Sequence, residues 1–527
     1  MRTHRRITAA VLAGASALAL AACGATANSS TTAAGAAGTA ATTTVTAATG
    51  AQSSDMASRL ADNTTTHAQA DDLDYDAASA VTVTLADGAT QVSGSGVTVA
   101  GNVVTITTKG TYVVSGSLSN GQLVVDSSVE GKVRIVLSGA TITNSSGAAI
   151  DVKAADEVVV VLAAGTTSTL TDGTGYDTSG ADAPDAALFS MADLTIGGTG
   201  TLVVHGRTAD GIATKDGLAI LGGTITVDAV DDGIRGKDYI DVQGGTLAVT
   251  SGQDGLKSTN ETDDTVGWIA VHAGTVRIAA GDDGMHAEGD LAISGGTVTV
   301  SKSTEGIEGA NIAISGGAIT VTASDDGVNV SSGSGTTQGN QGGGGGGGMQ
   351  DDGSLLSISG GTIVVNSGGD GLDSNGSTEI SGGIAVVSGP TANNNGALDS
   401  NGGINVSGGT VVAAGSAGMA ESPEADSAQG WVAVRLTQQV AAGQVISIVS
   451  GDQVIASFRT DKATASIVVS AAGIAKGQSY DVYVGGSLAG EQVGNYSPGG
   501  SISGATKVAT ATAGQAIFGG MGGGMRP

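Results

Sequence analysis

Residues 210–234 read DGIATKDGLAILGGTITVDAVDDGI, and two short phrases in this stretch return along the chain. The first phrase is an acidic residue followed by glycine and an apolar residue. It begins at Asp210, Asp232, Asp254, Asp283, Glu305, Asp326 and Asp370, in steps of 22, 22, 29, 22, 21 and 44 residues. The second phrase, Gly-Gly-Thr followed by alternating apolar residues, begins at Gly222, Gly244, Gly295 and Gly360. A fixed period near 22 residues indicates a repeat architecture.

Each repeat contains short runs of strand-forming residues in period-two alternation, separated by glycine pairs. No run shows the apolar spacing that a helix of ten or more residues needs. A unit of about 22 residues with two or three short strands is typical of one coil of a parallel β-helix, in which only the stacking of coils buries a continuous core. We therefore expect an all-β chain with a parallel β-helix.

Stacking brings the repeated acids into a column, because equivalent positions on successive coils lie about 4.8 Å apart. Two carboxylates at that distance repel by roughly 3 kcal/mol at an effective dielectric constant near 20, so solvation, protonation or a bound cation must stabilise them. Carboxylates without thiolates or a histidine set favour Ca2+. The alternative is a solvated acidic face that keeps the protein soluble. The predicted metal ligands are Asp210, Asp216, Asp231, Asp232, Asp238, Asp254, Asp282, Asp283, Glu305, Asp325, Asp326, Asp370 and Asp373.

The glycine after each acid predicts either a tight turn with positive φ or a close approach of two backbones. His286 is close in sequence to Asp283 and Glu288 and is the histidine with the best chance of joining a metal site, although a surface histidine is the commoner case.

Residues 1–22 carry a targeting signal. Three arginines among the first six residues precede an apolar run that ends in Leu20-Ala21-Ala22-Cys23. A small-residue cleavage site that ends in the only cysteine of the chain resembles a bacterial lipoprotein signal. We expect export, lipidation of Cys23 and exposure at the cell surface on a membrane anchor. A secretory signal with a chance cysteine is the alternative.

Composition divides the remaining chain. Residues 23–78 are rich in Ala, Thr and Ser and predict a flexible tether. Residues 79–420 carry the strand pattern and predict the β-helix, with a glycine-rich loop inserted at 331–352. Hairpin-like strands in residues 421–496 predict a small antiparallel β unit that caps the stack. Residues 497–527 return to small residues and predict a disordered tail.

The formal net charge is -28, and it becomes about -31 once the three arginines of the signal are removed. Such a charge disfavours nucleic acid and anionic membrane surfaces as partners. No second apolar stretch is long enough to cross a bilayer, so we expect contact with the membrane only through the lipid. Aromatic residues make up only 2% of the chain, and Trp268 is the one candidate for a sugar-stacking platform among the repeats, with a role as loop anchor as the alternative.

The phrases Asp-Asp-Gly-Ile-Arg-Gly-Lys-Asp (231–238), Ser-Gly-Gly-Thr-Val-Thr-Val (294–300) and Tyr-Val-Val-Ser-Gly-Ser-Leu (112–118) resemble a known family. It comprises bacterial cell-surface carbohydrate-binding proteins built as calcium-binding, polysaccharide-lyase-like right-handed β-helices. The resemblance covers about residues 80–490 and implies a right-handed β-helix, bound Ca2+ and recognition of plant cell-wall polysaccharide, either cellulose or polygalacturonate. Glu305 and the long glycine loop depart from the pattern.

Three functions remain open from the sequence. The first is a non-catalytic, calcium-dependent carbohydrate-binding protein, for which we assign no catalytic residue, leave the substrate-binding residues open and expect a monomer. The second is a lyase, which would need a base beside the Ca2+; Lys215, Arg235, Lys237 and Lys257 are the candidates, although ion pairing with the acids is the favoured interpretation of all four. The third is a passive stalk or adhesin.

Overall fold

The computed structural model describes residues 47–332 and 350–516. The chain divides into Met1–Thr42 and Thr43–Pro527, and all described residues belong to the second unit. The signal segment, Cys23, most of the glycine-rich loop and residues 517–527 lie outside the described ranges.

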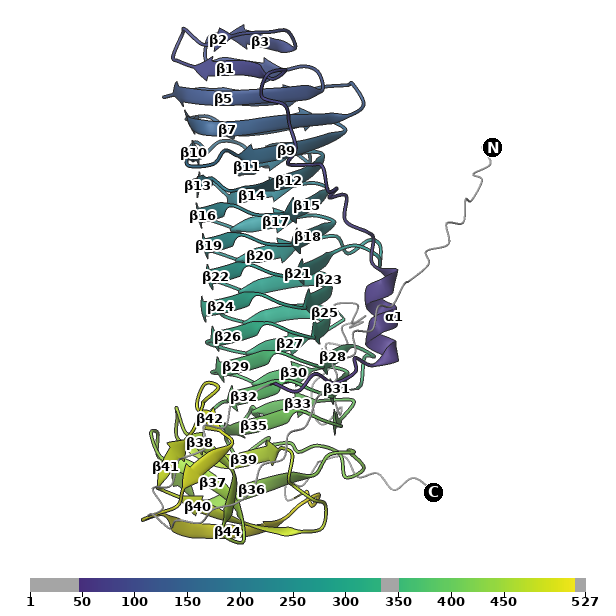
Figure 1. Ribbon diagram of the computed structural model, residues 1–527, viewed down its shortest axis with the longest axis vertical. Helices are drawn as coiled ribbons and strands as arrows, with labels where there is room; N and C mark the ends of the chain where they lie inside the picture. The colour runs from purple at the N-terminus through teal and green to yellow at the C-terminus, as the bar shows by residue number, and fades with distance from the viewer. Residues whose placement is uncertain (1–46, 333–349, 517–527) are drawn as a thin grey trace, which may run out of the picture. The chain divides into compact units, whose positions relative to one another are not determined.

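Three ladders of parallel strands run through the stack of coils (Figure 1). One coil consists of β14 (Asp210–Thr214), β15 (Gly217–Ile220) and β16 (Thr224–Ala229), and the next consists of β17 (Ile234–Gly236), β18 (Tyr239–Val242) and β19 (Thr246–Thr250). Each strand pairs with its equivalent one coil further on, as in Ile212 with Ile234, Leu218 with Ile240 and Ile225 with Leu247. The expected parallel β-helix is confirmed.

The ladder that contains β14 follows the acid–glycine phrases, and we call it the acid ladder. Besides β17, it contains β6 (Gln122–Asp126), β8 (Ile150–Ala154), β11 (Ala186–Ser190), β20 (Leu256–Ser258), the first part of β23 (Met285–Ile293), the first part of β25 (Ile307–Ile314), β27 (Val328–Val330), β30 (Leu372–Ser374) and β33 (Leu398–Ser400).

The ladder of β15 continues through β9 (Glu157–Leu162), β12 (Asp193–Gly198), β21 (Trp268–Val271), the second parts of β23 and β25, β28 (Leu355–Ile358), β31 (Ser377–Ile380) and β34 (Ile404–Val406). The ladder of β16 continues through β10 (Thr167–Thr171), β13 (Thr201–Gly206), β22 (Thr275–Ala279), β24 (Thr297–Lys302), β26 (Ala318–Ala323), β29 (Thr362–Ser367), β32 (Ile384–Ser388) and β35 (Thr410–Gly415). The stack begins with β1 (Val81–Leu85), β2 (Gln91–Val92), β3 (Val97–Ala100), β4 (Val103–Ile106), β5 (Gly110–Leu118) and β7 (Lys132–Thr143).

Alternation along each strand fills the interior with aliphatic side chains. In the acid ladder the apolar residue of each phrase points inward, and the seven residues Ile212, Ile234, Leu256, Met285, Ile307, Val328 and Leu372 are at most 1% exposed. Burying such a side chain contributes about 1.5–3 kcal/mol, and each coil repeats the contribution. The apolar residue therefore holds its coil to the core, and the acid before it stays at the turn.

The two kinds of repeated glycine have different roles. The second glycine of the Gly-Gly-Thr phrase has positive φ, for example +89° at Gly245, and makes the corner between two ladders. The glycine after the acid is needed for a close approach instead. A Cβ on Gly233 would lie 2.2 Å from Cγ1 of Val249 and 2.7 Å from the carbonyl oxygen of Gly255 in the next coil.

Residues 47–79, which we call the N-terminal strap, differ from the flexible tether that the composition predicts. The strap contains α1 (Ser54–Asp62), which no periodicity indicated, and Met56 is fully buried against Ala313 and Leu355. The tether prediction averaged over a stretch whose later part carries Met56 and Leu73. These side chains pack against the coils, and hydrogen bonds such as that from Arg59 to Asn311 hold the strap as well. Among the described residues, no helix is both long and apolar enough to cross a membrane.

The C-terminal unit is antiparallel, as expected, and joins the stack through β39 (Thr464–Ser470), which pairs with β35 and with β36 (Trp431–Val440). Its second sheet contains β37 (Val445–Ser450), β38 (Gln453–Arg459), β40 (Ser479–Val484), β42 (Tyr496–Ser497) and β44 (Thr506–Thr512), and β41 (Ser487–Ala489) pairs with β43 (Gly499–Ser501). Residues 497–516 therefore form part of this unit rather than a disordered tail. Thr506 and Thr512 lie in β44, which pairs with β40 at the edge of this sheet. Threonine is β-branched and therefore suits a strand.

Candidate functional site

The acids of the repeated phrase form a hydrogen-bonded column along the acid ladder. One carboxylate oxygen, Oδ1, accepts a hydrogen bond from the backbone N–H of the acid in the next coil. The pairs are Asp232 to Asp210 (3.2 Å), Asp254 to Asp232 (3.1 Å), Asp283 to Asp254 (2.8 Å), Glu305 to Asp283 (3.3 Å) and Asp370 to Asp326 (2.6 Å). The other oxygen, Oδ2, remains for a cation.

A column of basic side chains supplies that cation in the first half of the ladder. Arg235, Lys257 and His286 occupy equivalent positions on successive strands. Arg235 donates through Nε to Asp210 Oδ2 at 2.6 Å, and Lys257 Nζ lies 2.5 Å from Asp254 Oδ2. These contacts confirm the ion-pair interpretation for Arg235 and Lys257.

Asp185 extends this network toward the N-terminal coils. Its Oδ2 lies 2.6 Å from Arg235 Nη2 and 2.9 Å from Lys215 Nζ, which confirms ion pairing for Lys215 as well. Lys237 is exposed and forms no ion pair with any acid of the described ranges.

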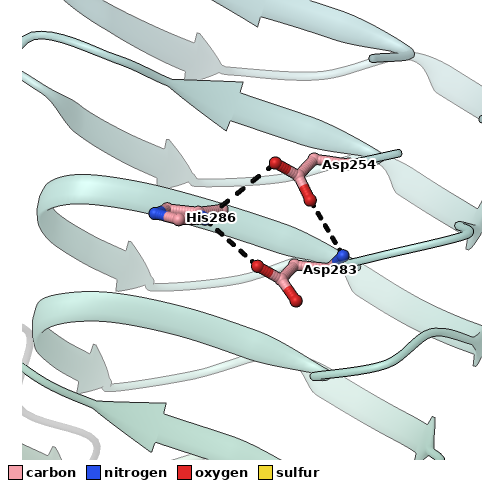
Figure 2. A group of neighbouring side chains, drawn as sticks. All are labelled: Asp254, Asp283 and His286. Carbon is pink, nitrogen blue, oxygen red and sulfur yellow. Dashed lines mark hydrogen bonds and ion pairs between the residues drawn. The ribbon is translucent and has the colours of Figure 1, made fainter. Parts of the chain in front are cut away.

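His286 is the last basic group of the column, since Glu308 is next in register. Figure 2 shows its ring beside Asp254 and Asp283. Its Nδ1 lies 3.1 Å from Asp283 Oδ2, 3.3 Å from Glu308 Oε2 and 3.9 Å from Asp254 Oδ2. Burial alone would lower the pKa of His286, but the hydrogen bond to Asp283 and the charges of Glu308 and Asp254 raise it to about 9. The imidazolium is therefore the cation of this coil at neutral pH, and the sequence did not assign it to the site.

Glu308 lies in register with His286 on the next coil, so the charge of this column of side chains changes from positive to negative there. Asp283, Glu305 and Glu308 offer three carboxylate oxygens that all lie within 4.8 Å of one another. Burial, and after it the charges of Glu305 and Asp283, raise the pKa of Glu308 to about 8 against the opposing charge of His286. Asn329 donates to Glu305 Oε2 at 2.7 Å. This all-oxygen group fits a hard cation.

The last coils carry acids without a basic partner. Asp373 and Asp399 lie side by side in register, and Asp370 accepts a hydrogen bond from the backbone N–H of Gly396. Among the described residues, no basic side chain forms an ion pair with Asp326, Asp370, Asp373, Asp399 or Glu421. Burial raises the pKa of Asp373 to about 8 and the pKa values of Asp370 and Glu421 to about 7, and neighbouring acids add to each shift.

The structure does not bring all the predicted ligands together. Asp231, Asp282 and Asp325 are exposed beside the column. Asp216 and Asp238 lie at the following corner of their coils, where burial and then the charges of Asp193 and Asp238 raise the pKa of Asp216 to about 6. Asp216 and Asp238 therefore lie apart from the column, because a short strand separates them from it, and their role as metal ligands stays a prediction.

Trp268 is a buried anchor rather than an open platform. Its ring stacks on Tyr239 at a centroid distance of 4.5 Å, and only 7% of the residue is exposed. His67 of the N-terminal strap contacts the hydroxyl of Tyr239 through Nδ1 at 2.6 Å. Neither Trp268 nor Tyr239 therefore presents a free ring face for a sugar.

Asp399 and Glu421 were missing from the predicted set for different reasons. Asp399 lies in Leu398-Asp399-Ser400-Asn401-Gly402, which repeats Leu372-Asp373-Ser374-Asn375-Gly376 one coil earlier. The sequence contains this second repeat, but Gly396 stands where the acid of the first phrase would be, so a search for acid–glycine phrases does not find this coil. Glu421 follows the last coil, where no spacing applies.

A family model described as "Carbohydrate-binding domain-containing protein" matches residues 100–345. A protein of Acetivibrio thermocellus with the same description is 39% identical over 136 residues, which are 25% of this chain and 48% of that protein. The chain thus spans about half the length of this relative.

A solved structure, described as the polysaccharide lyase-like protein from C. thermocellum in a gadolinium derivative, aligns with 26% identity over 57% of this chain and 96% of that one, with a TM-score of 0.39. The family model alone shows that residues 100–345, which contain the first half of the acid column and the Asp283–Glu308 group, resemble the carbohydrate-binding domain family, as the repeats predicted.

Proposed function

We propose that the chain is a calcium-dependent, non-catalytic carbohydrate-binding protein that recognises plant cell-wall polysaccharide of the polygalacturonate or cellulose type. It is exported, anchored through a lipid on Cys23 and exposed at the cell surface. The observation that carries the proposal is the all-carboxylate group of Asp283, Glu305 and Glu308, which lies within the residues that match the carbohydrate-binding family.

Calcium is the ion that suits this group best. Ca2+ takes six to eight oxygen ligands, and carboxylates on neighbouring coils can supply several at once. The acids from Asp326 to Asp399 have the same character and would hold a second ion. In the first half of the column, Arg235 and Lys257 already neutralise the acids, so we assign no ion there. At Asp283 and Glu308 the ion would take the place of the His286 imidazolium, which loses its proton more readily than Arg or Lys.

Bound calcium also resolves a problem of charge. A chain of about -31 repels uronate polymers, whereas Ca2+ on the acid ladder can share its remaining coordination positions with uronate carboxylates. A lyase has less support, because the basic groups nearest the column are engaged in ion pairs.

The test compares the mature wild-type protein with a Glu305→Gln/Glu308→Gln variant, and uses exposed Asp452→Asn in the C-terminal unit as the matched control. Calorimetry should detect two Ca2+ ions bound to the wild type and to the control, whereas the double variant should bind only the ion at the acids from Asp326 to Asp399. Oligogalacturonate binding should require Ca2+ and be lost in metal-free buffer. Absence of binding to every polysaccharide tested, or steady formation of unsaturated uronides by ultraviolet absorbance, would refute the proposal.

The anchor has its own test. Membrane fractionation of cells that express the full chain should find wild type in the membrane fraction and Cys23→Ala in the soluble fraction.

A further inference from the structure

An aspartate, a histidine and a serine from three successive coils lie together at the end of the ladder of β15. Asp241 is in β18, His272 directly follows β21, and Ser294 directly follows β23. Val242 pairs with Val271, and Val271 pairs with Ile293, so the register places His272 between the other two residues. None of the three belongs to the column of acids that we assign to calcium.

The distances within this group suit a chain of proton transfers. Ser294 Oγ lies 3.0 Å from His272 Nδ1, and His272 Nε2 lies 3.3 Å from Asp241 Oδ1. Asp241 Oδ1 is buried and makes no hydrogen bond within the described residues, and a small rotation of the imidazole would supply one. Hydrogen bonds between catalytic groups are often long or poorly aligned before a substrate binds.

Asp241 sets the tautomer of the imidazole. Burial raises the pKa of Asp241, but its contacts with donor side chains, His272 first among them, lower it overall, so the carboxylate is ionised at neutral pH. A carboxylate beside Nε2 favours the tautomer with the proton on Nε2, which leaves Nδ1 free to accept the proton of Ser294. Asp241 also raises the pKa of His272 against the effect of partial burial, and so stabilises the imidazolium that this transfer forms.

The serine is open to solvent, and two unused donors follow it. Ser294 is exposed, and the side chain of His272 is 52% exposed, so a substrate can reach both. Among the described residues, the backbone N–H groups of Gly295 and Gly296 make no hydrogen bond. Donors directly after a nucleophile can stabilise the oxyanion of a tetrahedral intermediate.

The position of Ser294 recurs in later coils without the histidine. Ser315 follows β25 and Ser359 follows β28 at equivalent places, but the residues one coil earlier are Ser294 and Ser315. The corners beside the site consist of Ala273-Gly274 and Gly295-Gly296, which offer no apolar wall for a long acyl chain. A small acyl group therefore suits the site best.

We propose that Ser294, His272 and Asp241 form a hydrolase site for short-chain carboxylic esters, with acetyl esters as the simplest substrates. Ser294 and His272 are the catalytic residues, and Asp241 is a positioning residue. This activity goes beyond the proposed binding function and does not depend on it, and the acid ladder keeps its non-catalytic role.

The reaction needs only the ester and water. Ser294 Oγ forms a bond to the ester carbonyl carbon while its proton passes to His272 Nδ1. The bond from this carbon to the alcohol oxygen then breaks, and His272 returns the proton to the departing alcohol. Water next attacks the acylated Ser294, again through His272, which releases the carboxylic acid and restores the serine.

The first test measures hydrolysis of p-nitrophenyl acetate and p-nitrophenyl octanoate by the mature protein. Ser294→Ala and His272→Ala should each lower kcat/KM for the acetate about 100-fold, and wild type should prefer the acetate about ten-fold over the octanoate. Ser315→Ala is the matched control and should keep the wild-type rate. A rate retained in Ser294→Ala but lost in His272→Ala would mean that the histidine attacks the activated ester by itself, and would overturn the site.

The second test uses diisopropyl fluorophosphate, with which a nucleophilic serine forms an O–P bond as fluoride leaves. Peptide mass spectrometry should find the adduct on Ser294 and not on Ser315. Asp241→Asn should slow this labelling, and lower kcat with KM unchanged, about ten-fold or more, because an amide can stabilise the wrong imidazole tautomer. The melting temperature of Ser294→Ala should equal that of wild type. Wild-type protein without an adduct on Ser294, or with equal labelling of Ser315, would overturn the inference and leave the binding proposal standing.

Discussion

Each acid of the column divides its two carboxylate oxygens between the backbone of the next coil and a cation. In Asp210, Oδ1 accepts a hydrogen bond from the backbone N–H of Asp232 and Oδ2 accepts one from Arg235. Because Asp210 is 2% exposed, removal of the guanidinium would leave a buried charge without its partner.

Arg235→Met should therefore lower the free energy of unfolding by about 3 kcal/mol. The double variant Asp210→Asn/Arg235→Met should recover part of this loss, since an asparagine side-chain oxygen still accepts from Asp232. Urea unfolding of the two single variants and the double variant measures the coupling. Losses that add without any recovery would contradict the ion pair as the source of the effect.

Gly233 sets how closely two coils approach. An added Cβ would meet the Val249 side chain at 2.2 Å and backbone of the next coil at 2.7 Å, neither of which can move without disturbing the stack. Gly233→Ala should therefore destabilise the protein by several kcal/mol, on the order of 3. The matched control is Gly180→Ala in a loop, where the nearest atom would be 3.3 Å away and the melting temperature should stay the same. Equal melting temperatures for both variants would contradict the close approach.

At the scale of the element, the N-terminal strap is held by a few separate contacts along the ladder of β15. Met56 is buried against Ala313 and Leu355, Arg59 donates to Asn311 at 2.7 Å, and Asp72 is fully buried beside Lys132. Segments with few buried contacts open locally before the whole protein unfolds.

Met56→Asp should release α1 without unfolding the coils, because burying a charge there costs more than the local contacts provide. Trypsin should then cleave after Arg59 at least ten-fold faster than in wild type, while the melting temperature of the stack changes little. The Ala57→Asp variant, whose substitution lies on the exposed side of α1, should be cleaved by trypsin at the wild-type rate. Equal cleavage of both variants would mean that α1 is not held through Met56.

The same scale shows what sequence could and could not predict. The strands, the turns and the core of a coil follow from local repetition, so the coil that begins at Asp232 could be predicted from its own residues. The order of the strap was not, because Met56 and Leu73 find their partners far along the chain, at Leu355 and Val136. For the site, spacing predicted the column but not its division into a half with basic partners and a half without. That division depends on the residue three positions after each acid, which is basic in the first coils and acidic or neutral in the later ones. Only the register between coils shows that these residues lie in one column.

At the scale of the whole molecule, the acids without basic partners make stability depend on pH. The folded-state pKa values of Asp370 and Glu421 are about 7 and that of Asp373 is about 8, whereas in an unfolded chain such groups titrate near 4. Between these values the folded protein binds more protons than the unfolded chain, so its free energy of unfolding falls as pH rises from about 4 to about 8.

Metal-stripped protein should therefore have its higher melting temperature near pH 5 and its lower one near pH 8. Calcium binds the deprotonated carboxylates, so millimolar Ca2+ should raise the melting temperature most at pH 8 and flatten the profile. Scanning calorimetry at both pH values with and without Ca2+ measures this, and Asp370→Asn/Asp373→Asn should show a flatter profile without metal. A melting temperature that rises with pH in metal-free buffer would contradict the assignment, because carboxylates with basic partners and lowered pKa values give that opposite slope.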